Sequence, residues 1–274
     1  GRVRAAEVAE LMSAEPALLE VRGATKRYGG LTAVNDVSFE VRRGEIFGIA
    51  GPNGAGKTTL FDVLTGMVRA TDGETLFQGK PIHQATVHEI CHMGITRTFQ
   101  QPSVFDSETV LGNVLVGSHF GSGAPWWRGL RRGDEQWDHA VSALDFVGLS
   151  GRESENSGPL PVYDKKRLMI ASALASGPEL LFLDEPFGGL TDDEIDQLMA
   201  LLEKIRDSGV TIVLIEHVMR ALMALADRIL IMNQGATLLQ GDPATVMRDP
   251  EVVRVYLGTG AAAEATRSVP VKGE

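Results

Sequence analysis

Eight consecutive residues, GPNGAGKT at 51–58, have the types and the spacing of a phosphate-binding loop. They meet the pattern G-x-x-x-x-G-K-[ST], in which glycines let successive backbone N–H groups point at phosphate oxygens. Lys57 supplies a cation, the hydroxyl of Thr58 can coordinate Mg²⁺, and Thr59 can donate to an inner phosphate. A glycine-rich structural turn is the alternative, and the full eight-residue match favours phosphate binding. The predicted nucleotide contacts in this loop are Gly51, Pro52, Asn53, Gly54, Ala55, Gly56, Lys57, Thr58 and Thr59.

A pair of carboxylates, Asp184 and Glu185, follows the apolar run LLFL at 180–183. In a nucleotide site one carboxylate holds Mg²⁺ through water, and the next can polarise the water that attacks the phosphate. An Asp-Glu pair at the end of a strand is by itself more often an ordinary solvated strand end. The phosphate loop in the same chain favours the functional interpretation, so we expect a site for ATP and Mg²⁺ built from both segments.

Three nearly continuous apolar runs predict the strands that position these groups. They span 45–50, 179–185 and 210–216, and each ends in polar residues, as parallel strands buried on both faces do. Open sheets of this kind bind ligands at the carboxyl ends of their strands, where both candidate segments fall. Two earlier segments, 18–28 and 34–41, alternate apolar and polar residues and predict half-exposed antiparallel strands.

Helical periodicity replaces the strand pattern between Gln101 and Gly177. The clearest helices are predicted at 135–149 and 165–175, and they indicate a helical lobe inserted into the sheet domain. The segment 228–241 is typical of a hairpin whose turn is built on Asn-Gln-Gly. The predicted divisions are a leader at 1–16, one α/β domain at 17–258 with the helical lobe at about 101–177, and a disordered tail at 259–274.

The composition limits the classes of protein to which this chain can belong. A chain of 274 residues with 43% hydrophobic residues can bury a large core without a partner. Its net charge of −10 argues against a protein built mainly to bind nucleic acid. Its apolar runs are far shorter than the roughly 20 residues that cross a bilayer, and its single cysteine, Cys91, cannot form an intrachain disulfide. We therefore expect a cytoplasmic protein.

With the loop and the carboxylate pair together, the chain resembles the ATPase subunits of ABC transporters from about Ala17 to Gly258. The resemblance implies an α/β fold of the P-loop NTPase class, with a mixed sheet core, an antiparallel β subdomain and the inserted α-helical lobe. It also implies that Asp184 holds Mg²⁺ and that Glu185 is the catalytic carboxylate.

Three further residues take their roles from this resemblance. Tyr28 in KRYGG matches the aromatic residue that stacks on adenine, although a tyrosine at a strand end is by itself more often a packing residue. Gln100 in TRTFQ matches the glutamine that contacts Mg²⁺ and reports the nucleotide state to the membrane subunit. His217 in LIEHVM matches the histidine that contacts the γ-phosphate. A histidine after a strand is more often structural, and the spacing from Asp184 and Glu185 favours the functional role.

Several segments are similar to one branch of the family, the ATPases of branched-chain amino acid importers. These segments are RYGGLTAVNDVSFEV, GPNGAGKTTLFDVLTG, GITRTFQ and VVRVYLG. The resemblance implies a subunit that is peripheral on the inner face of the cell membrane and works with transmembrane permease subunits and, indirectly, a solute-binding protein. Importers of urea and other amides use similar subunits, so the solute stays open between branched-chain amino acids and related small polar solutes.

The chain departs from the family where a signature segment, usually LSGGQ, begins a helix that contacts the γ-phosphate held by a partner subunit. The aligned stretch here is LPVYD at Leu160–Asp164. Pro161 has no N–H to donate, and the bulk of Tyr163 keeps the backbone away from a phosphate. This predicts two unequal sites and a second ABC ATPase subunit that is a different chain. A working variant that relies on its helix dipole, in a homodimer, is the alternative.

The resulting hypothesis is ATP-driven closure of two ATPase subunits, in which Glu185 orients water, His217 senses the γ-phosphate and hydrolysis reopens the pair. Two alternatives come from other classes. One is a soluble ABC ATPase not linked to transport, which coiled-coil arms, tandem ATPase halves or basic surfaces would have favoured. The other is a regulatory nucleotide-binding subunit that hydrolyses ATP weakly. The altered LPVYD segment favours it, and the intact Glu185 and His217 oppose it.

Overall fold

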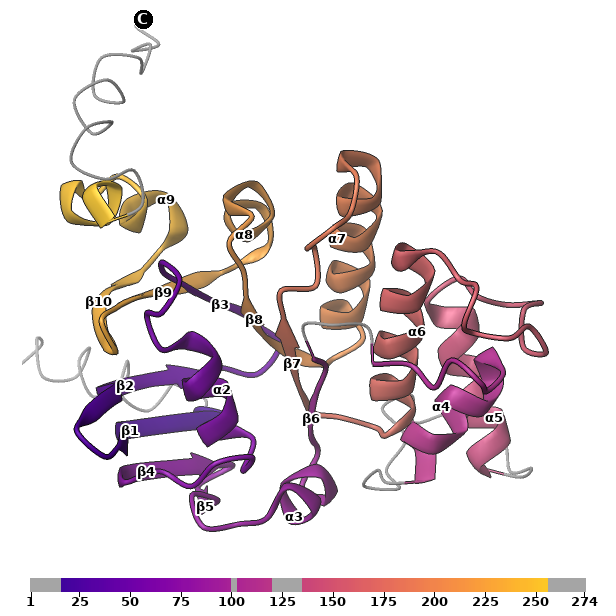
Figure 1. Ribbon diagram of the computed structural model, residues 1–274, viewed down its shortest axis with the longest axis horizontal. Helices are drawn as coiled ribbons and strands as arrows, with labels where there is room; N and C mark the ends of the chain where they lie inside the picture. The colour runs from indigo at the N-terminus through magenta and orange to yellow at the C-terminus, as the bar shows by residue number, and fades with distance from the viewer. Residues whose placement is uncertain (1–15, 100–102, 120–134, 256–274) are drawn as a thin grey trace, which may run out of the picture.

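Two β-sheets and the helices that pack around them make up the described part of the chain (Figure 1). The computed structural model describes residues 16–99, 103–119 and 135–255. Within these ranges, no helix has both the length and the apolar character needed to pass through a membrane.

The larger sheet has six strands in the order β10-β9-β3-β8-β7-β6. Neighbouring strands are parallel except β9 and β10, which form an antiparallel hairpin. Every residue of β3, β7 and β8 is buried, as the continuous apolar runs predict for strands covered on both faces. The bounds are β3 Ile46–Ala50, β6 Ile95–Arg97, β7 Leu180–Asp184, β8 Thr211–Ile215, β9 Arg228–Asn233 and β10 Ala236–Gly241.

The smaller sheet has four antiparallel strands in the order β2-β1-β4-β5. Its register pairs Leu19 with Val41 at one end of β1 and Tyr28 with Leu31 at the other. The two residues between β1 and β2 are both glycines, which suits a tight hairpin turn. The bounds are β1 Leu19–Tyr28, β2 Leu31–Val41, β4 Asp72–Phe77 and β5 Lys80–Pro81.

Helices α4, α5 and α6 lie together at the far side from the smaller sheet (Figure 1). They form the helical lobe that the periodicity predicted between the strands. The helix bounds are α2 Lys57–Leu64, α3 Val87–His92, α4 Val110–His119, α5 Glu135–Phe146, α6 Val162–Ala175, α7 Asp192–Asp207, α8 Met219–Leu225 and α9 Pro243–Val246.

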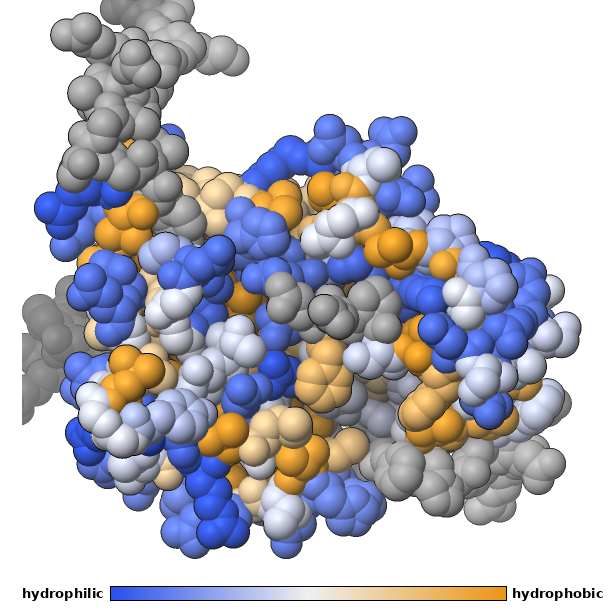
Figure 2. Space-filling model, in the orientation of Figure 1, coloured by the Kyte–Doolittle hydropathy of each residue, from blue (hydrophilic) through white to orange (hydrophobic). Residues whose placement is uncertain are grey.

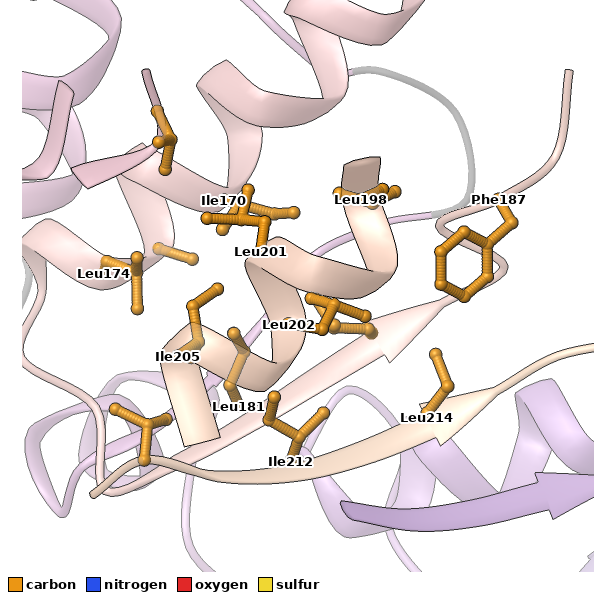
Figure 3. Packing of buried hydrophobic residues seen from close by; sticks show 14 of the residues in the cluster. Ile170, Leu174, Leu181, Phe187, Leu198, Leu201, Leu202, Ile205, Ile212 and Leu214 are labelled. Carbon is orange, nitrogen blue, oxygen red and sulfur yellow. The ribbon is translucent and has the colours of Figure 1, made fainter. Parts of the chain in front are cut away.

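Two hydrophobic clusters join these layers. One lies between the two sheets, around α2, and contains Phe39, Phe47, Phe61 and Phe182. The other joins the helical lobe and α7 to the opposite face of the larger sheet. Figure 3 shows this second cluster, with Leu198, Leu201, Leu202 and Ile205 of α7 between the lobe helix α6 and strands β7 and β8. The core therefore holds the lobe against the same strands that carry the predicted carboxylates.

The mixed sheet, the antiparallel subdomain and the helical lobe are as predicted, with differences at element ends. Helix α6 begins at Val162, three residues before the predicted segment 165–175. The hairpin turn after β9 has two residues, because Asn233 already pairs with Ala236. Strand β6 was not predicted, since its three residues are too few to show a pattern.

Candidate functional site

The phosphate loop joins β3 to α2 and depends on glycine at two points. A Cβ atom on Gly51 would lie 2.2 Å from the carbonyl oxygen of Met232, and one on Gly56 would lie 2.3 Å from that of Ala33. Gly56 also has a φ of +96°, which residues with a side chain rarely adopt. The loop therefore packs directly against the backbones of β9 and β2, and only glycine fits at these two positions.

The hairpin turn between β9 and β10 supports the loop from the side. Gly235 donates its N–H to the carbonyl of Ala55 at 3.0 Å, and its own carbonyl accepts from the N–H of Asn35 at 2.8 Å. Gln234 and Gly235 have φ values of +48° and +84°, the left-handed pair that a two-residue hairpin turn needs. A turn far away in the sequence thus fixes the loop in space.

One cavity of about 620 Å³ brings the loop together with the carboxyl end of β7, and its size is ordinary for a small-molecule site. Eight predicted residues line it: Asn53, Gly54, Ala55, Gly56, Lys57, Thr58, Thr59 and Glu185. Five residues that sequence reasoning missed also line it: Leu31, Thr32, Ala33, Gln234 and Gly235. The sequence showed the last two as turn residues, but no local signal connected that turn to the loop.

Lys57 begins α2, and its ammonium group folds back over the loop. Nζ donates to the carbonyl oxygens of Gly51 at 2.7 Å and Pro52 at 3.1 Å. Burial lowers the pKa of Lys57, while the negative charges of Glu185 and Asp184 oppose that shift. The loop thus holds a buried cation between its own carbonyls and the two predicted carboxylates.

Asp184, the last residue of β7, is buried and bound to Arg97 of β6. Arg97 Nη2 lies 2.8 Å from Asp184 Oδ2, and Arg97 Nη1 lies 2.5 Å from Oδ1 of Asp62 on α2. Burial raises the pKa of Asp184, and the hydrogen bond and charge of Arg97 work against that rise. Arg97 was not predicted, although it lies in the segment TRTFQ quoted for Gln100. A buried arginine needs carboxylate partners, but these lie 35 and 87 residues away.

Glu185 follows β7 with a left-handed backbone. Its φ is +48°, one of four positive values at non-glycine residues in the ranges that the structure describes. Such a conformation costs about 1 to 3 kcal/mol and persists only where the surroundings hold it. The N–H of Glu185 donates to the carbonyl of Ile215 at 2.9 Å, which extends the pairing of β7 with β8 by one residue. The residue then turns toward the cavity that it lines.

His217 lies beside this carboxylate, after the end of β8. Its Nδ1 is 3.7 Å from Oε2 of Glu185 and 3.8 Å from Oε2 of Glu216. The side chain is 55% exposed and is not among the residues that line the cavity. The structure therefore brings His217 and Glu185 together at the edge of the site, and the role of His217 stays a prediction.

Among the described residues, three other predicted nucleotide contacts, Tyr28, Gly51 and Pro52, are not in the lining of the cavity. Tyr28, at the end of β1, is 47% exposed and has Nζ of Lys26 at 4.9 Å from its ring centre. Its strand partner Leu31 lines the cavity, so the ring lies next to the site without bounding it. Gln100 lies outside the described residues.

The residues present suit a phosphate-bound magnesium ion. Thr58 offers an exposed hydroxyl in the cavity, and Asp184 offers a buried carboxylate at the adjoining strand end. The donors are hard oxygens and are few in number, as Mg²⁺ prefers when phosphate and water complete its octahedron. In the described ranges, no three His, Cys, Asp or Glu side chains gather into a metal cage. The fit is to a nucleotide-bound ion and not to a structural metal.

Two family profiles match this sequence. The profile described as "ABC transporter" matches residues 34–188, which is more than half of the chain. The chain belongs to this family. The profile described as "Branched-chain amino acid ATP-binding cassette transporter" matches residues 236–262. The protein is therefore an ATP-binding cassette and part of an ABC transporter complex.

Relatives and solved structures agree with the assignment. This ABC cassette is 39% identical over 249 residues to the high-affinity branched-chain amino acid transport ATP-binding proteins BraF of Pseudomonas aeruginosa and LivG of Escherichia coli. Each alignment covers 88% of this chain and 98% of the relative. A solved ATP-binding cassette of an ABC transporter in its ADP conformation has a TM-score of 0.81 and 29% identity, covering 89% of this chain and 100% of that one. The predicted fold class is confirmed.

The first turn of α6, where the cassette family has its signature, has an unusual surface here. Its N-cap is Pro161, which makes no side-chain cap hydrogen bond. Val162 is 48% exposed. The guanidinium of Arg167 lies 4.6 Å from the ring centre of Tyr163. Side chains, and not bare backbone, therefore form the outer surface of this helix start.

Asp164 adds a negative charge to the same turn. Its Oδ2 lies 2.6 Å from Arg152 Nη1, and its Oδ1 lies 2.5 Å from Arg167 Nη2. Burial alone would raise the pKa of Asp164, but the hydrogen bonds and charges of Arg167 and Arg152 outweigh burial and lower it. An ionised carboxylate therefore occupies the first turn of α6 at neutral pH.

Proposed function

We propose that this ABC cassette hydrolyses Mg-ATP and that hydrolysis drives import of branched-chain amino acids or a related small polar solute. The observation that carries the proposal is the cavity shared by the phosphate loop and Glu185, with His217 3.7 Å from that carboxylate. A phosphate cradle, a candidate base and a polar group at its side are what phosphoryl transfer to water requires.

The proposed roles divide between holding the phosphates and orienting the water. The loop N–H groups and Lys57 bind phosphate oxygens, with Tyr28 against the base. Thr58, Gln100 and Asp184 hold Mg²⁺, which neutralises charge on the phosphates when bound. Glu185 accepts a hydrogen bond from the attacking water and orients it, and His217 donates to the γ-phosphate.

The cassette is proposed to work with a second ABC ATPase subunit that is a different chain. The first turn of α6 supports this, because its N-cap is Pro161 and its next residues are Val162 and Tyr163 instead of glycine. Proline has no N–H to donate to a phosphate, and a bulky side chain keeps the phosphate from the backbone. The partner subunit would then supply the complete signature to the phosphate loop described here.

The same observation favours a second candidate, a regulatory cassette that binds ATP and hydrolyses it weakly. If neither subunit completes a competent site, Glu185 and His217 would have no transition state to stabilise. A measured hydrolysis rate separates the two candidates, since they share every feature of nucleotide binding.

An apolar cleft is the proposed contact with the membrane permease. It has a volume of about 150 Å³, lies between α2, α3 and β6, and includes exposed Met67, Val87 and Phe99. Figure 2 shows hydrophobic surface gathered over this region. Exposed apolar clusters on a folded domain typically mark interaction surfaces, and this one adjoins the segment that contains Gln100. The kinship with BraF and LivG supports the cargo, which the permease and a solute-binding protein would select.

The test of the proposal is Glu185→Gln in the cassette co-purified with its permease. We expect ATP hydrolysis to fall at least about 100-fold while ATP affinity is retained, because the amide fills the same space but cannot act as a base. Glu179→Gln is the matched control, since Glu179 lies at the other end of β7 in an exposed ion pair with Arg43. Unchanged hydrolysis in Glu185→Gln would contradict the catalytic role, and a cassette that never co-purifies with membrane subunits would contradict the transport role.

A further inference from the structure

A buried lysine, Lys166, reaches from the helical lobe to the catalytic end of β7. It lies on α6 and is 6% exposed. Its Nζ donates to the backbone carbonyl of Glu185 at 3.3 Å. The same carbonyl accepts from the N–H of Gly188 at 3.3 Å, so two donors converge on the peptide unit that follows Glu185. A lysine is rarely buried unless its charge has a use or a partner.

Glu216 provides a second buried anchor beside this peptide unit. Its side chain is fully buried. Oε1 accepts from the N–H of Phe187 at 3.0 Å, and Oε2 accepts from the N–H groups of His217 and Val218, both at 2.9 Å. One carboxylate thus ties the loop after β7 to the segment after β8 with charge-assisted hydrogen bonds.

Lys166 is the cation that faces this cluster. Burial lowers the pKa of Lys166, while the charges of Glu216 and Glu185 work in the opposite direction. The cation and the two carboxylates therefore form one electrostatic unit around a strained residue, since Glu185 has a φ of +48°. None of these contacts uses the phosphate loop.

The position of Lys166 on α6 connects the unit to the packing of the lobe. Ile170 and Leu174 follow at intervals of four residues and so share the face of the helix. Figure 3 shows these two side chains on the side of α6 that faces Leu201 and Ile205 of α7. Lys166 therefore lies at the cavity end of the apolar stripe that holds the lobe to the sheet domain.

We propose that Lys166, together with Glu216, positions the catalytic carboxylate: Lys166 holds the carbonyl of Glu185, and Glu216 holds the loop that follows. This inference rests on the function proposed above. Lys166 is a positioning residue, because it acts on the reaction only through Glu185. A displacement of α6 relative to β7 would move the ammonium donor and so change the orientation of Glu185. Nucleotide binding would be preserved, because Lys166 does not line the cavity.

The test compares variants in the transporter complex that contains this full chain. Lys166→Met keeps the length of the side chain and removes its donor and charge. We expect the kcat of ATP hydrolysis to fall about tenfold, with KM and ATP affinity within about twofold of the original. Lys166→Arg restores a donor and a charge, and should recover at least about half of kcat.

A lysine elsewhere gives a matched control. Lys204 on α7 also donates to a backbone carbonyl, that of Phe146 at 3.1 Å, and it lies outside the site. Lys204→Met should leave kcat within about twofold. If Lys166→Met does not fold, which thermal unfolding will reveal, Lys166→Leu, which also lacks a donor and a charge, takes its place in every comparison.

The decisive measurement is a double-mutant cycle with Glu185→Gln under single-turnover conditions. Because Lys166 acts through Glu185, adding Lys166→Met to Glu185→Gln should leave the residual rate unchanged. A further tenfold fall in the double variant would overturn the proposal, as would an unchanged kcat or a lost ATP affinity in Lys166→Met alone. Absence of hydrolysis in the unsubstituted complex would instead contradict the proposed function.

Discussion

Two helix starts in this cassette both lack a side-chain cap, and they differ in backbone geometry and in chemistry. Neither N-cap residue, Gly56 before α2 or Pro161 before α6, makes a side-chain cap hydrogen bond. Helix α2 begins with Lys57 and has no acidic residue in its first turn, whereas α6 has Asp164 there. The first start can accept the charge of a phosphate, and the second already carries an anion of its own.

The difference shows that a helix N-terminus needs bare backbone and matching charge before it can bind a phosphate. At α2, Gly56 lets the loop pack against the carbonyl of Ala33 and leaves its N–H groups in the cavity. At α6, the corresponding positions are Pro161, which has no N–H, exposed Val162, and Tyr163, whose ring lies against Arg167. The partial positive charge at the N-terminus is similar in α2 and α6, so the side chains decide which of the two helix starts can bind a phosphate.

The largest expected effect is a loss of ATP affinity when a side chain is added to the backbone of the phosphate loop. Gly56→Ala would place a Cβ atom 2.3 Å from the carbonyl of Ala33 in a residue with φ of +96°. We expect ATP affinity to fall at least about 100-fold, measured by equilibrium binding. Gly44→Ala is the control, because Gly44 has a φ of +71° with no atom near its Cβ position. Equal losses in both variants would attribute the effect to backbone strain alone.

The next effect should come from giving α6 the bare backbone that α2 has. In a Glu185→Gln background, we expect Pro161→Ser with Tyr163→Gly and Asp164→Gln to strengthen Mg-ATP-dependent homodimerisation about tenfold, measured by light scattering. The reason is that the substitutions restore an N–H, allow close approach and remove a negative charge. Adding Lys57→Met to this variant should abolish the gain. Equally strong dimerisation without the three substitutions would contradict the contrast between the two helix starts.

A smaller effect concerns stability and the ion pairs that Asp164 makes in place of a phosphate contact. Asp164→Asn should lower the free energy of unfolding by about 1 to 3 kcal/mol at pH 7, because Arg152 and Arg167 lose a charged acceptor. Urea unfolding measures the change. Glu251→Gln, which breaks an exposed pair with Arg254, should change stability by less than about 0.5 kcal/mol. Similar losses in both variants would show that the ion pairs of Asp164 stabilise the fold no more than an exposed ion pair does.

The smallest effect is the pH dependence of the free energy of unfolding that Asp164 contributes. The pKa of Asp164 is lower in the folded chain than its ordinary value, so its stabilisation is present above the unfolded pKa of about 3.9 and disappears as the pH falls through the folded pKa. The difference in stability between the original chain and Asp164→Asn should therefore begin to shrink below about pH 4 and continue to shrink as the pH falls through the folded pKa. A difference that stays constant from pH 7 to pH 3 would assign the loss to packing instead of charge.

Much of the scaffold could be predicted because its signals are local. Continuous apolar runs identified β3, β7 and β8, and the spacing of glycines and Lys57 identified the phosphate loop. The placement of Glu185 and His217 at strand carboxyl ends followed from the rule for parallel sheets, and the structure showed that β7 and β8 are neighbours. The functional roles of the predicted site residues all stay predictions, those of Glu185 and His217 as much as those of Tyr28 and Gln100.

What could not be predicted depends on contacts between distant residues. Arg97 lies between Asp62 and Asp184, Gly235 holds the phosphate loop, and Lys166 binds the carbonyl of Glu185. The sequence around each of these residues contains no pattern that indicates its partner. Their partners are set by which elements the core packs together.

By itself, the sequence predicted where phosphate and carboxylate chemistry is located, because those residue types and spacings act within a single turn or strand end. Only the tertiary structure decided how the carboxylates are held and oriented. The side chains of Arg97, Lys166 and Glu216 are buried. Burial strengthens the electrostatic interactions of these groups and makes an unpaired charge costly. The same burial depends on how the lobe, α7 and both sheets pack, and no short segment of the chain contains that information.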